Sequence, residues 1–262
     1  MTDPRIQARR VRVERQRGHR RLGMLLAVLA AAGLSAGVVS VLHSRLFAAR
    51  SVVIAGAVNT SRSEILAVSG LDKEPPLIDV NAGAISLRVD RLAWVLSASV
   101  KVEWPSTVAV SVVERVPVAA SHLLGGDYAV LDSTGRVLAD ESSRPAGLPL
   151  VVLPGASASP GSSLGASARD LLVAAAQLPE SLVPRVNEIV DSVTDGVVVR
   201  LEGGVNAVVG DDEALPEKFV SLATVLSRVN LTSVGGIDLR VAAAPVLTPL
   251  TSASNVQGKG DG

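Results

Sequence analysis

The feature that most constrains this chain is an uncharged stretch of 21 residues near its start, Leu22 to Leu42. At about 1.5 Å per residue, a helix of this length crosses a hydrocarbon core of roughly 30 Å. Acidic residues are few before the stretch (Asp3 and Glu14), whereas eight arginines precede it: Arg5, Arg9, Arg10, Arg12, Arg15, Arg17, Arg20 and Arg21. Under the positive-inside rule we expect a cytoplasmic basic head (1–21), a transmembrane helix (22–42) and a type II topology in the inner (plasma) membrane, with the remainder extracytoplasmic.

A cleaved signal peptide is the alternative interpretation of this apolar stretch. Signal peptides usually carry an apolar core of about 7 to 15 residues followed by a small-x-small cleavage site. The stretch here is longer, and Phe47-Ala48-Ala49 places a bulky residue where a small one is needed. The sequence therefore favours a permanent anchor.

Gly33 and Gly37 form a GxxxG spacing inside the expected span. This spacing allows a second membrane helix to approach closely, so the two glycines are candidates for helix packing. The stretch is rich in Ala and Gly, so chance is the competing explanation.

The charges downstream of the head argue against one class of function. Removing the eight arginines and two acids of the head from totals of 25 and 25 leaves 17 basic and 23 acidic residues. This acidic balance argues against nucleic-acid binding. The chain has no cysteine, which excludes disulfides, thiolate zinc sites and a cysteine nucleophile.

Two folded regions are expected after the span. The first has strand, helix, helix, strand, strand order: a strand at 51–55, a helix at 62–69 with Ser61 and Glu64 as a capping box and Gly70 as its stop, a helix after Asn81, and strands at 100–104 and 107–114. The second has hairpins at 128–138 and 197–209, a strand at 148–153, helices from Ser167 (paired with Asp170) and over 215–229, and one last strand at 237–247. The fold class is therefore α+β.

Patterns for catalysis or for binding small molecules are weak. Gly161 to Gly165 fits the G-x-S-x-G nucleophile elbow, but that triad needs a histidine after the serine, and the last histidine is His122. His19, His43 and His122 are too scattered to form a metal site together. Asp211-Asp212-Glu213 suits a helix N-terminus better than a cation site. We expect no enzyme activity, no cofactor, no metal and no small-molecule substrate.

Several short motifs in a fixed order resemble a known family. They are Val52-Val-Ile-Ala-Gly56, Ser61-Arg-Ser-Glu-Ile65, Pro76-Leu-Ile-Asp79, Arg91-Leu92, Ala98-Ser-Val100, Glu103-Trp-Pro105 and Val113-Glu-Arg-Val-Pro117. The chain is identified as a member of the FtsQ/DivIB family of cell-division proteins, and a residue bias to Ala, Val, Arg and Gly suggests the actinobacterial type. The resemblance implies a POTRA domain over 50–117, an FtsQ-type β domain over 118–248 and a disordered tail over 249–262. Ala57 departs from the family, which commonly has Asn there.

The resemblance also implies a function, that of a non-catalytic divisome scaffold at the septum. Its implied partners are the membrane itself, FtsB/DivIC-like and FtsL-like proteins, and further division proteins of the FtsW, FtsI and FtsK kinds. The implied partner-binding residues lie near the last strand: Arg240, Val241, Pro245, Val246, Leu247 and Lys218. Pro245 also fits simple protection of a free sheet edge. The rival functions are an envelope-biogenesis or export chaperone that uses a POTRA domain, and a membrane-tethered cell-wall hydrolase.

Overall fold

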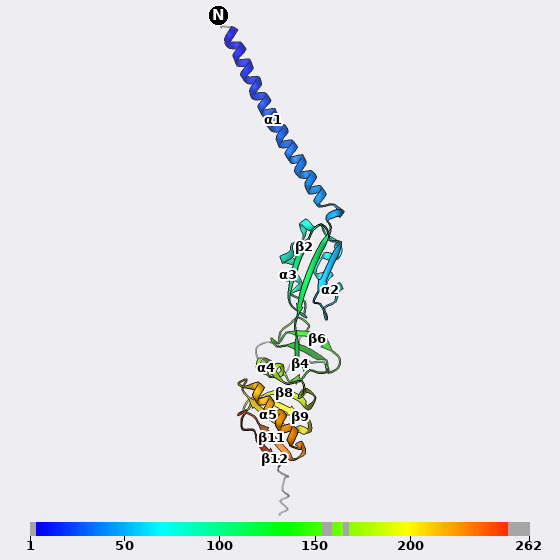
Figure 1. Cartoon of the computed structure of the whole chain (residues 1–262), viewed down its shortest axis with the longest axis vertical. Coiled ribbons are helices and arrows are strands. Elements are labelled where there is room, and N and C mark those ends of the chain that lie inside the picture. The colour runs from blue at the N-terminus through cyan, green and yellow to red at the C-terminus, as the bar shows by residue number, and fades with distance from the viewer. Residues whose placement is uncertain (1–3, 154–158, 165–167, 251–262) are drawn as a thin grey trace, which may run out of the picture. The chain divides into compact units, whose positions relative to one another are not determined.

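The structure is a computed structural model that describes residues 4–153, 159–164 and 168–250, with side chains from Leu22 onward (Figure 1). The chain divides into two compact units. The first comprises residues 1–89 and 97–112, and the second comprises residues 90–96 and 113–262.

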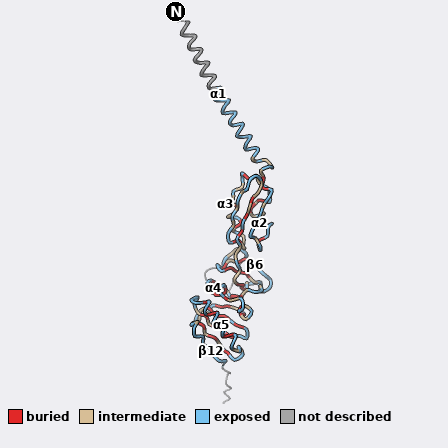
Figure 2. Tube along the Cα trace, in the orientation of Figure 1, coloured by how far each residue is buried: buried red, intermediate tan, exposed pale blue. Residues whose placement is uncertain are grey.

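Helix α1 (Pro4–Leu42) contains the expected membrane span. Its segment Leu22–Leu42 is long and apolar enough to cross a membrane, and it was the one such segment found among the described residues. No part of this segment is buried against the rest of the protein, as the pale blue of α1 shows in Figure 2. These properties fit a helix whose apolar side chains face lipid.

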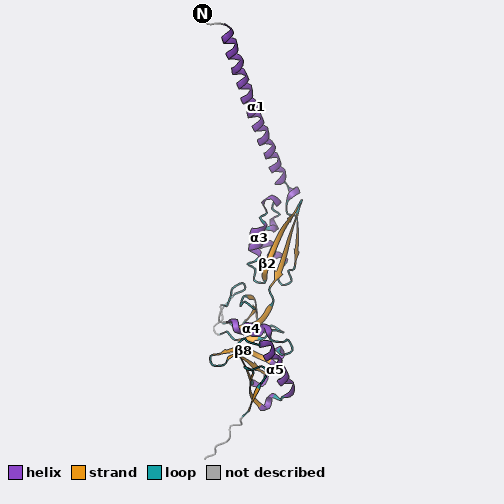
Figure 3. Ribbon diagram, turned by 60° about the vertical axis from the view of Figure 1, so that its left-hand side comes forward, coloured by secondary structure: helices purple, strands orange, loops and turns teal. Residues whose placement is uncertain are grey.

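The globular part of the first unit has the predicted order β1 (Ser51–Ala55), α2 (Arg62–Ser69), α3 (Ala82–Val89), β2 (Val95–Glu103), β3 (Thr107–Glu114). The three strands form one sheet in the order β1-β3-β2, with β1 and β3 parallel. Figure 3 shows α3 beside this sheet. The first unit also has three short 3-10 helices: η1 (Arg45–Phe47), η2 (Leu71–Lys73) and η3 (Leu77–Asp79).

Local capping explains why α2 begins and ends where the sequence predicts. The Ser61 hydroxyl oxygen accepts a hydrogen bond from the Glu64 N–H, and this satisfies an otherwise unpaired donor of the first turn. Gly70 stops the helix in the left-handed region at φ 74°, where its N–H donates to the Leu66 carbonyl. The predicted Ser61 cap and Gly70 stop are confirmed.

The second unit is a nine-stranded mixed sheet in the order β12-β11-β10-β9-β8-β7-β4-β5-β6. Its strands are β4 (Pro117–His122), β5 (Tyr128–Asp132), β6 (Val137–Glu141), β7 (Leu150–Val151), β8 (Val186–Ser192), β9 (Gly196–Leu201), β10 (Asn206–Gly210), β11 (Val234–Asp238) and β12 (Val246–Pro249). The pairs β4–β7, β7–β8 and β10–β11 are parallel, and the others are antiparallel.

Two helices, α4 (Arg169–Gln177) and α5 (Leu215–Arg228), cover the core of this unit. Helix α4 contacts β4, β7, β8 and β9, whereas α5 contacts β10 and α4. Their apolar stripes meet the buried side of the sheet, where Leu172, Ile189, Leu201 and Phe219 are almost fully buried. Burial of side chains of this size contributes roughly 1.5–3 kcal/mol each, so this core is the main source of stability in the unit.

One strand prediction was wrong. The expected single strand over 237–247 is two antiparallel strands, β11 and β12, joined by a turn. The turn forms because an Asp238 carboxylate oxygen accepts the Arg240 N–H, and the Ala244 N–H then donates to the Val241 carbonyl. Strands β4 and β8 were not assigned from the sequence.

Some expectations fall on residues outside the described ranges. These include Ser167 as the cap of α4, and the tail beyond residue 250. Pro249, which was expected to start the tail, is the last residue of β12.

Candidate functional site

The candidate partner-binding surface is the outer edge of β12. This strand pairs with β11 along one side and ends the strand order of the sheet, and no strand in the described part of the chain pairs with its other side. All four of its residues are exposed, including Val246 at 60% and Leu247 at 40%. An exposed edge of this kind offers unpaired main-chain donors and acceptors to an incoming strand.

The loop before β12 extends this surface. It carries Val241, which is 62% exposed, and Pro245, which is also exposed. The loop is held to α5 because the Ser221 hydroxyl donates to the Ala242 carbonyl at 2.6 Å. Five of the six predicted partner-binding residues therefore lie together: Arg240, Val241, Pro245, Val246 and Leu247.

Arg240 is fixed at the start of this loop by its neighbours. Its guanidinium contacts the Asp238 carboxylate at 2.5 Å, and its stem lies over Gly210, where an added Cβ would come within 3.0 Å of the Arg240 Cγ. The hydrogen bonds from Arg240 lower the pKa of Asp238 below its usual range, and the same pairing raises the pKa of Arg240. Arg240 is thus a charged, pre-oriented residue beside an apolar strand edge.

Lys218, the sixth predicted residue, lies in a different environment. Its side chain is only 3% exposed, and its Nζ contacts the Asp211 carboxylate at 2.7 Å and the Asp211 carbonyl at 3.2 Å. The hydrogen bond from Lys218 lowers the pKa of Asp211. Lys218 therefore holds the loop that follows β10, and its ammonium group faces this loop rather than solvent.

The other residues singled out from the sequence remain separate from this surface. Gly33 and Gly37 lie on α1 with open space around them. Ser163 forms an isolated bridge with Arg136, and His122 stacks with Tyr128 at a ring-centroid distance of 4.2 Å. Gly165, the end of the elbow pattern, lies outside the described residues. No group of three or more metal-ligating side chains was found among the residues that the structure describes.

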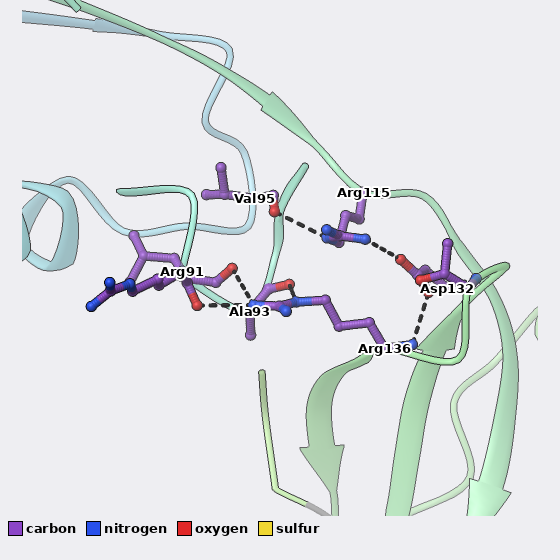
Figure 4. A network of polar contacts seen from close by, with 8 residues as sticks. Arg91, Ala93, Val95, Arg115, Asp132 and Arg136 are labelled. Atoms are coloured by element: carbon purple, nitrogen blue, oxygen red, sulfur yellow. Dashed lines mark hydrogen bonds and ion pairs between the residues drawn. The ribbon is translucent and has the colours of Figure 1, made fainter. Parts of the chain in front are cut away.

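Sequence reasoning missed a polar network in the second unit, which Figure 4 shows. The Arg136 guanidinium donates to the carbonyls of Arg91, Leu92 and Ala93. Arg115 donates to the next two carbonyls. Its backbone N–H donates to the Trp94 carbonyl, and its Nε donates to the Val95 carbonyl. Five consecutive carbonyls, from Arg91 to Val95, are thus held by two arginines.

Asp132 organises both arginines of this network. Its Oδ2 accepts from Arg115 at 2.7 Å, and its Oδ1 accepts from the Thr134 N–H, the Thr134 hydroxyl and the Arg136 N–H. Burial alone raises the pKa of Asp132, but the hydrogen bonds from Thr134, Arg115 and Arg136 outweigh it, and the net pKa is lowered. The Asp-Ser-Thr-Gly turn was recognisable from the sequence, whereas its distant arginine and carbonyl partners were not.

Together the features define a class: a membrane-anchored protein with a POTRA-like domain and a mixed β domain. Family models agree with this description. "POTRA domain, FtsQ-type" matches residues 47–115, and "Cell division protein FtsQ/DivIB, C-terminal" matches residues 120–240. The chain belongs to the FtsQ/DivIB family of cell-division proteins, as the motif resemblance indicated.

Curated relatives of the chain are named after the same family. The chain is 29% identical to the "Cell division protein FtsQ" of Mycolicibacterium smegmatis over 71% of this chain and 54% of that protein. It is 34% identical to the FtsQ of Caulobacter vibrioides over 61% of this chain and 57% of that protein. The matches span between about half and two thirds of these relatives' own length.

A solved structure, the major extracytoplasmic domain of DivIB from Geobacillus stearothermophilus, also matches. It is 21% identical, with a TM-score of 0.31, and the match covers 45% of this chain and 98% of that chain.

Proposed function

We propose that this chain is a non-catalytic scaffold of the divisome that recruits other division proteins at the septum. Its basic head and α1 anchor it in the inner membrane with type II topology, so both folded units are extracytoplasmic. The β12 edge binds an extended segment of an FtsB/DivIC-like protein and its FtsL-like partner. The POTRA domain binds other division proteins, of the FtsW, FtsI and FtsK kinds.

The observation that supports this proposal most strongly is the open, uncharged edge of β12. Strand addition at an edge draws its affinity from main-chain hydrogen bonds and its specificity from side chains on alternate positions. Val246 and Leu247 supply one apolar side chain on each face of this strand, and Val241 adds a third on the loop beside it. Arg240 supplies a charge that favours an acidic residue on the partner.

Catalysis has little support in the described residues. Ser163 lies in the segment that covers β6, and its position beside Arg136 provides no general base. The acidic residues Asp132, Asp211 and Asp238 each have a neighbouring Arg or Lys that stabilises the ionised form. These pairs are suited to holding loops rather than to proton transfer.

The test is conditional depletion of the protein in its host, with rescue by variants of the full chain. We expect long, aseptate or branched cells on depletion, full rescue by the unaltered chain, and failure of rescue by a variant lacking residues 241–247. A Val193→Asp variant serves as the matched control, because Val193 is fully exposed in the β8–β9 turn. It should rescue division.

The two rival functions predict different results, the first in the same depletion experiment and the second in an assay of the purified chain. Normal division with a leaky or export-defective envelope would support the chaperone that uses a POTRA domain. Hydrolysis of purified cell wall by the full chain would support the tethered hydrolase, and we expect no such activity.

A further inference from the structure

The segment between the membrane span and β1 carries an exposed leucine and a half-buried phenylalanine. Leu46, within η1, is 66% exposed. Its neighbour Phe47 pairs with Trp104, with ring centroids 5.7 Å apart and planes inclined by 60°. The whole chain has two Trp, two Phe and one Tyr, so two of its five large aromatic residues meet at this point.

Two other segments of the first unit adjoin this pair. The Ser51 N–H donates to the Ser106 carbonyl, which places the β2–β3 turn beside the start of β1. The Ala49 N–H donates to the Pro75 carbonyl at 2.9 Å, and the His43 ring lies 3.4 Å from the Asp79 carboxylate, so η3 adjoins the same segment. Ile78 of η3 is 44% exposed. We name Leu46, Phe47, Ile78 and Trp104 the juxtamembrane patch.

The covalent path from the membrane to this patch is short. Helical hydrogen bonds continue past the span, from the His43 N–H to the Val39 carbonyl and from the Ser44 N–H to the Val41 carbonyl. At about 1.5–2.0 Å per residue, the five residues from Leu42 to Phe47 advance the chain by only about 10 Å. The headgroup region extends several ångströms beyond the hydrocarbon core, so the patch lies within this region or just outside it.

Closure of the domain end explains only part of this arrangement. Packing against Phe47 covers part of the Trp104 ring, yet Trp104 remains 53% exposed. Leu46 and Ile78 are exposed to 66% and 44%. Tryptophan is enriched at membrane interfaces because its ring is apolar while its N–H can still reach water or headgroups. The charges nearby are mixed: Arg45 and Arg50 are exposed, Glu103 is exposed next to Trp104, and Asp79 contacts His43.

We propose that the juxtamembrane patch inserts into the headgroup region of the membrane that α1 crosses, with Arg45 and Arg50 placed to meet lipid phosphates. The first folded unit is then seated on the bilayer surface instead of moving freely on a flexible tether. The proposal depends on the membrane anchor but on neither the topology nor the division partners, because the patch follows the span whichever side it faces.

Two single-tryptophan variants of the full chain in liposomes test this directly. Trp94→Phe leaves Trp104 as the reporter, whereas Trp104→Phe leaves Trp94, which is separated from it by the nine residues of β2, roughly 30 Å along the strand. We expect lipids with a quencher near the headgroup to remove roughly half or more of the Trp104 emission and to leave Trp94 emission nearly unchanged. Lipids with the quencher at the bilayer centre should quench Trp104 less.

A second pair of variants separates insertion from accidental proximity. In the Trp94→Phe background, Leu46→Ser together with Ile78→Ser should reduce the quenching of Trp104, because two apolar contacts with the interface are lost. Val58→Ser is the matched control, since Val58 is 87% exposed outside the patch, and it should leave the quenching unchanged. Absence of quenching at Trp104, or equal quenching at Trp104 and Trp94, would overturn the proposal.

Discussion

The two edge strands of the nine-stranded sheet, β6 and β12, differ in how they are covered and charged. At one edge, the start of β6 is covered by residues 161–164: the Val137 N–H donates to the Ser162 carbonyl, and the Gly161 N–H donates back to the Val137 carbonyl. The rest of β6 ends in the acidic pair Asp140 and Glu141. At the other edge, β12 has neither a charged residue nor a described segment against it.

We propose that this difference sets which edge is available for binding. Sheet edges are usually protected by charges, proline or covering segments, because an open edge invites pairing with other chains. The β6 edge has both a cover and charges, whereas β12 has only Pro249 at its end and Pro245 just before it. The β12 edge is therefore the one on which strand addition is expected.

The largest effect that we predict concerns the covered edge. Asp132→Asn leaves Arg115 without its carboxylate and weakens the turn that leads into β6. Breaking a largely buried ion pair from one side costs about 3 kcal/mol. Chemical denaturation of the full chain in detergent should show this loss in the free energy of unfolding, and an unchanged value would contradict the role given to Asp132.

The same residue gives a prediction about pH. Because the folded state lowers the pKa of Asp132 below 3.8, its contribution to stability is present above that pH and is lost as the pH falls through the lower, folded-state value. The unaltered chain should therefore lose stability in acid more steeply than Asp132→Asn does. Parallel acid titrations of the two proteins, followed by circular dichroism, provide the measurement.

A substitution on the open β12 edge should change partner binding and leave stability nearly unaffected. Val246→Asp introduces a charge on an exposed strand, so folding should be nearly unaffected, while an incoming strand must bury that charge. We expect binding of an FtsB/DivIC-like partner to weaken by roughly tenfold or more. Val193→Asp is the control in the same titration, and equal weakening by both variants would remove the distinction between the two edges.

A smaller effect is expected for Arg136→Lys. Lysine keeps the charge but loses the planar fork that reaches the carbonyls of Arg91, Leu92 and Ala93. We expect a loss of about 1 kcal/mol, with faster amide hydrogen exchange over residues 91–96. Slower or unchanged exchange there would show that Arg136 does not hold this segment.

The smallest predicted effect is on the open edge. Arg240→Ala should leave the melting temperature unchanged, because the Arg240 side chain is 58% exposed. It should return the pKa of Asp238 toward its usual value of 3.8, since the hydrogen bond from Arg240 lowers it. An NMR titration of the Asp238 carboxyl measures this shift, and partner binding should weaken severalfold in the same variant.

The parts of the fold that the sequence predicts well are those fixed by nearby residues. Ser61, Glu64 and Gly70 fix the ends of α2 through contacts within a few positions, and the resemblance to FtsQ-type POTRA domains rests on the same segments. The break between β11 and β12 was missed because residues 237–247 contain mostly apolar and small residues. It depends on one side-chain turn at Asp238.

Contacts between distant positions were beyond pattern reading. The Arg136 guanidinium contacts carbonyls more than 40 positions earlier, and no periodicity encodes that pairing. Lys218 illustrates the same limit, because it was expected among the partner-binding residues, while its ammonium group is buried against Asp211. The predicted surface around Arg240 to Leu247 lies together because those residues are close in the chain.

Amide hydrogen exchange of the full chain in liposomes, with and without the host's FtsB/DivIC-like protein, tests the central claim most directly. We predict that the partner slows exchange at the amides of residues 246–248 and leaves those of 139–141 in β6 unchanged. Unchanged exchange in β12 while the partner is bound would contradict the account, because it would place the partner elsewhere on the molecule.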